Sequence, residues 1–175
     1  VPPVFLPLSL RIRKIRMKRL IGRLCILCSL LLCFCQAFAV TGWAYTFETD
    51  AGVEISMDQD ASEVLEQLGK AESYYEAQSS SHQGKEKVFT YDGFELSTYP
   101  SGGSDYVKSI WFLNEETVTP EGIHIGSTID EMKEAYGDDY TEENGKYQYV
   151  SDEGILAFYT KKGAVSGIEY KSIGE

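Results

Sequence analysis

Two segments of the chain alternate apolar and polar residues with the period of an amphipathic helix. Spacings of three and four residues place the apolar side chains on one face of each helix. We therefore expect helices at residues 60–69 and 128–137. Their apolar stripes are Ala61, Val64, Leu65 and Leu68 in the first and Ile129, Met132 and Tyr136 in the second.

Both expected helices carry the same start and stop signals. A side chain that can cap the first turn is followed three residues later by a glutamate, as in a capping box. A glycine suited to a left-handed C-cap follows the last apolar position. These signals are the N-caps Asp60 and Thr128, the box partners Glu63 and Glu131, and the glycines Gly69 and Gly137.

Three strand-like runs follow each helix at matching places, separated by turn signals such as Asp92-Gly93 and Asn144-Gly145. Before each helix, residues 52–55 also match residues 122–125, and we expect a short strand in both. The pattern predicts an α+β fold made of a tandem repeat, each copy a strand, a helix and a three-stranded antiparallel meander. The paired runs are 88–91 with 146–149, 94–99 with 155–159, and 107–112 with 165–170.

One helix on three strands buries little apolar surface, so a single copy is marginal and two copies sharing a core are expected. This predicts one structural domain over residues 46–173. Its parts are an N-terminal lead-in at 40–51, repeat unit 1 at 52–113, a joint at 114–121 and repeat unit 2 at 122–173.

The first 39 residues differ in character from the rest. A basic stretch begins at Met17, an apolar run covers residues 24–34, and small residues at Ala37 and Ala39 fit a signal peptidase. We predict a signal peptide cleaved after Ala39, behind an upstream extension at residues 1–16. A retained membrane anchor and a lipidated cysteine are the alternatives.

All four cysteines lie in this apolar run, so the expected mature chain has no disulfide and no thiol. Export without disulfides favours a bacterial envelope or secreted protein. Membrane contact is then expected only through the signal segment.

The net charge of the chain limits the kinds of molecule that it is expected to bind. From residue 40 onward the chain has nine lysines, no arginine and all 27 acidic residues, a net charge of −18. Binding to nucleic acid needs a basic surface, so nucleic acid is excluded as a partner of this part. A protein partner fits better, and a cationic one would complement this charge.

The repeat unit, with residues 122–131 entering a helix that ends at Tyr136-Gly137, resembles small secreted or lipid-anchored bacterial proteins of the β-lactamase-inhibitor-protein-like class. That class is related in fold to outer-membrane assembly lipoproteins. The resemblance covers residues 52–170. It implies a curved sheet with helices packed on one face and an open face that binds protein, but no residue matches an inhibitory contact of the class.

Catalytic, metal and cofactor motifs are not found in the sequence, and we expect neither an enzyme nor a cofactor or metal site. His82, after three serines, could serve a serine nucleophile, but such insertions are usually loops. His124 is interpreted as an exposed strand residue. Oxygen ligands for calcium are conceivable at residues 138–145 and around Asp58, but the spacing of a calcium-binding loop is missing.

Aromatic residues give the candidate site. If Ile110 and Phe112 face the core, then Trp111 faces the other way, and the same alternation turns Tyr99 outward. Tryptophan and tyrosine amid acids are typical of recognition surfaces. We expect Trp111 and Tyr99 to bind a protein partner, unless the loop expected at residues 72–86 covers Trp111. A small envelope enzyme or carbohydrate-binding module is the alternative function.

Overall fold

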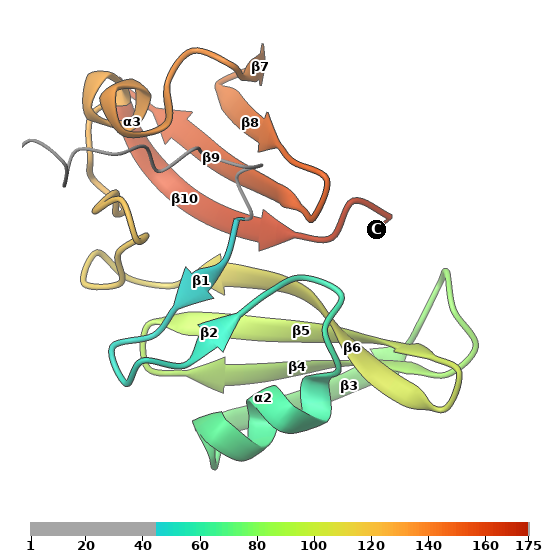
Figure 1. The fold of residues 1–175 in the computed structure, drawn as a ribbon. Coiled ribbons are helices and arrows are strands. Elements are labelled where there is room, and N and C mark those ends of the chain that lie inside the picture. Colours follow the sequence, from blue (N-terminus) through green and yellow to red (C-terminus); the bar gives the residue numbers. More distant parts are fainter. Residues whose placement is uncertain (1–44, 175) are drawn as a thin grey trace, which may run out of the picture. The chain divides into compact units, whose positions relative to one another are not determined.

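A computed structural model describes residues 45–174 of the chain, and these residues belong to one compact unit (Figure 1). The predicted signal peptide, its cysteines and the cleavage position after Ala39 lie outside the described residues. Within residues 45–174 the fold is α+β, mostly antiparallel sheet with two helices.

Eight strands form one antiparallel sheet in the order β3-β4-β5-β6-β10-β9-β8-β7, and β1 and β2 form a separate pair. The two halves of the large sheet meet where β6 pairs with β10. The strands are β1 (Phe47–Glu48), β2 (Glu54–Ile55), β3 (Ser73–Gln78), β4 (Lys85–Tyr91), β5 (Phe94–Ser101), β6 (Ser104–Phe112), β7 (Thr141–Glu143), β8 (Lys146–Val150), β9 (Ile155–Lys161) and β10 (Ala164–Lys171).

The helices are α2 (Ala61–Leu68) and α3 (Ile129–Tyr136), within one residue of the predicted segments. Thr128 and Glu131 form the predicted capping box, whereas Asp60 caps α2 by accepting from the Ser62 amide at 2.9 Å. Gly69 and Gly137 end the helices with φ of +71° and +79°, but their ψ values of −149° and −165° lie outside the left-handed helical region.

The six predicted strand runs all lie within strands β4, β5, β6, β8, β9 and β10. Two expectations were wrong. The segment at residues 72–86 is mainly the β3–β4 hairpin rather than a loop, with only residues 79–84 between the strands. Residues 122–125 are not a strand, because only four residues separate Ile123 from the cap Thr128 and a turn closes there, with Ser127 N–H donating to His124 O at 3.1 Å.

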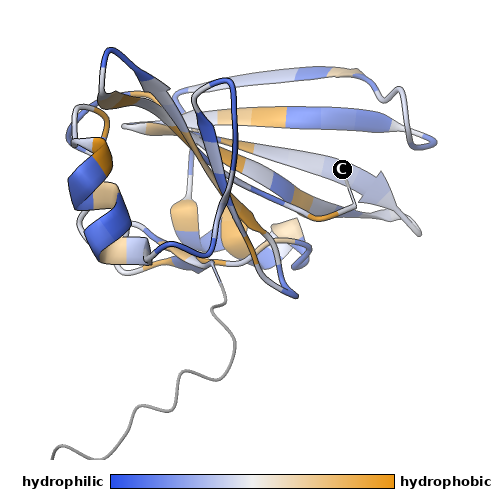
Figure 2. Ribbon diagram, turned by 90° about the horizontal axis from the view of Figure 1, so that it is seen from above, coloured by the Kyte–Doolittle hydropathy of each residue, from blue (hydrophilic) through white to orange (hydrophobic). Residues whose placement is uncertain are grey.

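One hydrophobic core joins both halves of the sheet and both helices. In β5, for example, alternate side chains from Phe94 to Thr98 are buried in it. Figure 2 colours the hydrophobic and hydrophilic residues along the strands and helices. Leu65, expected in mid-stripe, is only partly buried. The fully buried side chains include Phe47, Val64, Leu96, Ile110, Met132, Leu156, Phe158, Ile168 and Tyr170.

Candidate functional site

Trp111 lies at the centre of the eight-stranded sheet, on the face opposite the core. Its neighbours in β6, Ile110 and Phe112, are 0% and 1% exposed, while Trp111 itself is partly exposed. Directly opposite Trp111 stand Glu95 of β5 on one side and Glu169 of β10 on the other. The residues paired with Trp111 on the two neighbouring strands are therefore both glutamates.

The indole leans over β10. A Cβ atom built on Gly167 would lie 3.2 Å from Trp111 Cζ2, so the ring occupies the space that a side chain at position 167 would need. Beyond Gly167 the Tyr159 ring lies 5.1 Å from the indole, centroid to centroid, at an angle of 53°. Glycine at this position is what lets the tryptophan lie against the backbone.

Two polar side chains contact the Tyr159 ring. Tyr159 donates its hydroxyl hydrogen to Glu169 Oε2 at 2.7 Å, and Lys146 Nζ lies 5.1 Å from the centroid of the Tyr159 ring. Burial, and then the hydrogen bond to Glu169, raise the pKa of the Tyr159 hydroxyl, which stays protonated as a donor. We call Trp111, Tyr159, Glu169 and Lys146 the seam cluster.

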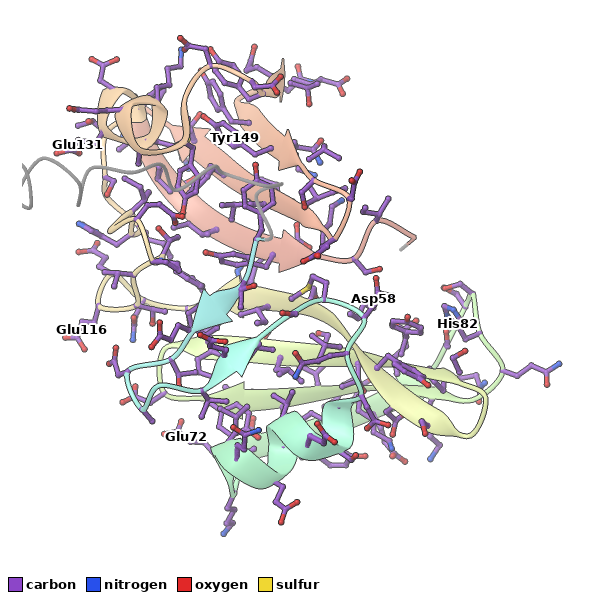
Figure 3. The ribbon with its side chains drawn as sticks, viewed as in Figure 1. Asp58, Glu72, His82, Glu116, Glu131 and Tyr149 are labelled. Atoms are coloured by element: carbon purple, nitrogen blue, oxygen red, sulfur yellow. The ribbon has the colours of Figure 1, made fainter. Side chains whose placement is uncertain are left out.

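Tyr99 belongs to a different group of side chains. It pairs with Tyr106, whose ring lies 5.8 Å away, and the His82 ring lies 4.9 Å on another side. Its hydroxyl donates to Asp58 Oδ1 at 2.8 Å, and Figure 3 labels Asp58 and His82 toward the same end of the molecule. The structure gives Trp111 and Tyr99 separate sets of neighbours, and the hairpin turn contacts Tyr99 rather than Trp111.

The serine and histidine of this hairpin turn have structural contacts. Ser79 Oγ donates to Glu86 Oε1 at 2.7 Å and accepts from the backbone N–H of His82 at 3.0 Å. The Ser79 bond is the first cause of a lowered pKa at Glu86. These two hydrogen bonds of Ser79 therefore help to close the hairpin turn.

The acidic residues considered as calcium ligands make contacts within the fold. Asp58 accepts from both Tyr99 and Ser172, and residues 141–143 of the acidic stretch form the edge strand β7. His124 Nδ1 lies 2.9 Å from the carbonyl of Ile125. Within residues 45–174, no three histidine, cysteine or acidic side chains converge closely enough to hold a metal ion.

The sequence placed Trp111 on the outer face of the sheet but did not identify its neighbours Tyr159, Lys146 and Gly167. Nothing in the order of residues shows that β6 and β10 pair, and only that pairing brings these residues to the indole. The one available signal was Val-Ser-Gly-Ile in β10, where a glycine inside a strand pattern often marks a close approach.

Comparison with family models, curated proteins and solved structures found no match to this chain. Neither helix within residues 45–174 is long and apolar enough to cross a membrane.

Proposed function

We propose that the chain is a noncatalytic secreted or cell-envelope binding protein, which recognises a protein partner through the sheet face around Trp111. The observation that carries the proposal is the partly exposed indole on the face turned away from the core, packed against Gly167 and Tyr159, with Glu95 and Glu169 at the cross-strand positions on either side. A large ring whose position is fixed before binding loses little entropy on association, and tryptophan is enriched among interface hot spots.

The proposed partner has a cationic contact surface. Glu95 and Glu169 would attract lysine or arginine side chains to the edge of the indole, where a cation can also lie over the ring. The net charge of −18 from residue 40 onward favours such a partner by long-range attraction. Export through the proposed signal peptide would place the encounter outside the cytoplasm.

We also propose that the domain is a tandem duplication, with both helices on one face of the sheet as in the β-lactamase-inhibitor-protein-like class. Hydrogen bonds that recur in both halves support it. Thr49 N–H donates to Val53 O at 3.0 Å, as Thr119 N–H does to Ile123 O at 2.9 Å.

The ends of the helices support the duplication as well. The carbonyl of the C-cap Gly69 accepts from the Tyr91 hydroxyl at 3.4 Å, as that of Gly137 does from Tyr149 at 2.9 Å. An irregularity of register also interrupts the β5–β6 pair and the β9–β10 pair, one in each half of the sheet.

A photo-crosslinking experiment tests the protein-binding proposal. A photoreactive amino acid at Ser97, on the Trp111 face, should capture a partner from envelope extracts, and the same probe at the exposed Glu66 of α2 should not. Trp111→Ala should abolish the Ser97 product and weaken binding of the purified partner by about 2 kcal/mol or more, the scale of a hot spot. Val118→Ala, which shortens a 42% exposed side chain, is the matched control.

A carbohydrate-binding module is the second candidate, favoured by the Trp111–Tyr159 ring pair beside the Glu169 carboxylate. Aromatic rings can stack on sugar rings while a carboxylate accepts hydrogen bonds from hydroxyls. A glycan array separates the two functions. One strong glycan signal lost in Trp111→Ala, with no protein captured at Ser97, would reverse the order of the two proposals.

A further inference from the structure

The two edges of the eight-stranded sheet are built differently. At one edge, β7 has three residues, all exposed, and two of them are the acids Glu142 and Glu143. At the other edge, β3 has six residues without proline or lysine, paired to β4 in an unbroken register. Short, charged strands protect sheet edges from pairing with another chain, and β3 has few of these protections.

The free backbone groups of β3 can be identified. Ser79 N–H donates to Gly84 O at 3.0 Å at the end of the β3–β4 pair. Because hydrogen bonding alternates along an antiparallel strand, the backbone N–H and C=O groups of Ser73, Tyr75 and Ala77 point towards β4. The N–H and C=O groups of the residues between them, Tyr74, Glu76 and Gln78, therefore point away from the sheet.

Side chains on this edge offer contacts to an added strand. Tyr75 is 66% exposed and Tyr74 is 52% exposed, on opposite faces. Tyr74 donates its hydroxyl hydrogen to Glu76 Oε2 at 2.6 Å, and Lys85 also binds Glu76. One face of the edge thus presents a fixed tyrosine ring with a carboxylate, and the other presents an open tyrosine ring.

Two kinds of strand could pair with β3, one from a partner protein and one from a second copy of this chain, and the net charge favours the first. Two copies joined at β3 would bring together two domains that each carry a net charge of about −18 from residue 40 onward, which opposes association. An extended segment bearing lysine or arginine gains from the same field. Opposite Tyr74 and Glu76, a basic side chain can lie over the Tyr74 ring and share the Glu76 carboxylate with Lys85.

We propose that the edge strand β3 takes up an extended basic segment of a partner protein as an added antiparallel strand. Basic residues of the segment lie on the face of Tyr74 and Glu76, and apolar residues lie on the face of Tyr75. Binding of this kind uses backbone hydrogen bonds for affinity and alternate side chains for specificity. The proposal goes beyond the one made for Trp111 and stands apart from it, since β4 and β5 separate β3 from β6.

The geometry of β3 predicts which backbone amides of the bound segment form hydrogen bonds with it. Residues opposite Tyr74 and Glu76 exchange both backbone hydrogen bonds with β3, so the amides of the basic residues are used and those of the apolar residues are not. A fluorescein-labelled ten-residue peptide of alternating lysine and valine is the probe. N-methylation of its lysine amides should weaken binding by about tenfold or more, while N-methylation of its valine amides should change it by less than about threefold.

Protein variants provide the matched comparison. Glu76→Pro removes a free N–H and a carboxylate from β3 without removing a β3–β4 backbone hydrogen bond. Glu142→Pro likewise replaces a glutamate of β7, at the opposite edge, by proline, and it also removes the bond that Gly145 N–H donates to Glu142. Glu76→Pro should lose the peptide and Glu142→Pro should keep it, with circular dichroism confirming that both fold. A glutamate-for-lysine peptide should not bind either protein.

The proposal is overturned if the two methylated peptides bind equally, because attraction to an acidic surface alone would then explain the affinity. Equal binding to both proline variants would lead to the same conclusion. A dimer in sedimentation velocity that Glu76→Pro dissociates would make a second copy the occupant. Trp111→Ala should leave the peptide affinity unchanged, so failure here and failure of the Trp111 proposal are distinguishable.

Discussion

Replacing Gly167 with alanine tests whether the Trp111 indole lies on the backbone of β10. The added methyl would sit 3.2 Å from Trp111 Cζ2, 3.5 Å from Cη2 and 3.7 Å from Tyr159 Cβ. The first distance is tighter than an ordinary carbon–carbon contact, so the indole has to move by a few tenths of an ångström. Backbone strain adds nothing, because Gly167 is not among the glycines with positive φ.

Two opposing effects set the size of the change. Overpacking costs about 1–3 kcal/mol in a closed core, and a partly exposed ring that can shift toward solvent belongs at the lower end of this range. Alanine also restricts the unfolded chain, which stabilises the protein by about 0.4–1 kcal/mol. Gly174→Ala isolates this second effect, since a Cβ atom at Gly174 meets nothing within 4 Å. We expect Gly167→Ala to be about 1 kcal/mol less stable than Gly174→Ala.

Urea unfolding of both variants, in a Trp43→Phe background that leaves Trp111 as the only fluorophore of its kind, measures the difference. The Trp111 emission of Gly167→Ala should shift to longer wavelength, and acrylamide should quench it more strongly, because the ring is lifted off the strand. Acrylamide is uncharged, so the acidic surface does not repel it. Equal stability of the two variants with an unchanged emission spectrum would refute the placement of the indole over Gly167.

Three further predictions follow from the core, the helix cap and the buried tyrosines. Met132→Ala should lower the free energy of unfolding by about 2–5 kcal/mol, measured in urea, and the partly buried Leu65→Ala should cost less; equal losses would contradict the burial difference. Thr128→Ala should cost about 1 kcal/mol at pH 7 by removing the α3 cap. The Thr128 bonds lower the pKa of Glu131, so the part of the cap that involves the Glu131 carboxylate should be present above its ordinary pKa of 4.5 and be lost as the pH falls through the lowered value, and a Thr128→Ala loss that stays the same throughout acid titration would contradict it. Burial raises the pKa of Tyr149 to about 12 from 10.0, so stability should be full below pH 10 and decline between pH 10 and 12, measured by urea unfolding across this range, and a constant free energy of unfolding would contradict it.

The sequence predicted the local elements well, because caps, apolar stripes and turn residues are properties of neighbouring positions. The capping box of Thr128 and Glu131 formed as expected, and each of the six strand runs lies in a strand. Strand β3 was missed because Ser73–Gln78 has no alternation of polar and apolar residues. An edge strand in contact with solvent on both faces has no core-facing side, so its sequence is free of the signal that identifies a strand.

The candidate site could be predicted only in part, for a different reason. Alternation within β6 is sufficient to turn Trp111 away from Ile110, and this needs no knowledge of neighbouring strands. The residues that surround Trp111 depend on the β6–β10 pairing, which places Trp111 opposite Glu169, 58 positions further along the chain. The neighbours of Tyr99 could not be predicted either, since they depend on the β5–β6 register, which pairs Tyr99 with Tyr106 and Trp111 with Glu95, and on the hairpin turn that brings His82 to Tyr99.

Trp111 and Glu169 oppose each other directly where β6 meets β10. Under the proposed duplication they are the same position in the two copies, and a position can pair with its own equivalent only on a pseudo-twofold axis. At this axis the inward-facing positions of the copies stay alike, with Ile110 matching Ile168, because the shared core requires apolar side chains of similar volume from both. The outward positions are under no such packing requirement, and here one copy has an indole and the other a carboxylate. Under the proposed duplication, the β6–β10 seam is a place on the outer face where equivalent positions of the two copies meet with different side chains, and a binding site there would belong to neither copy alone.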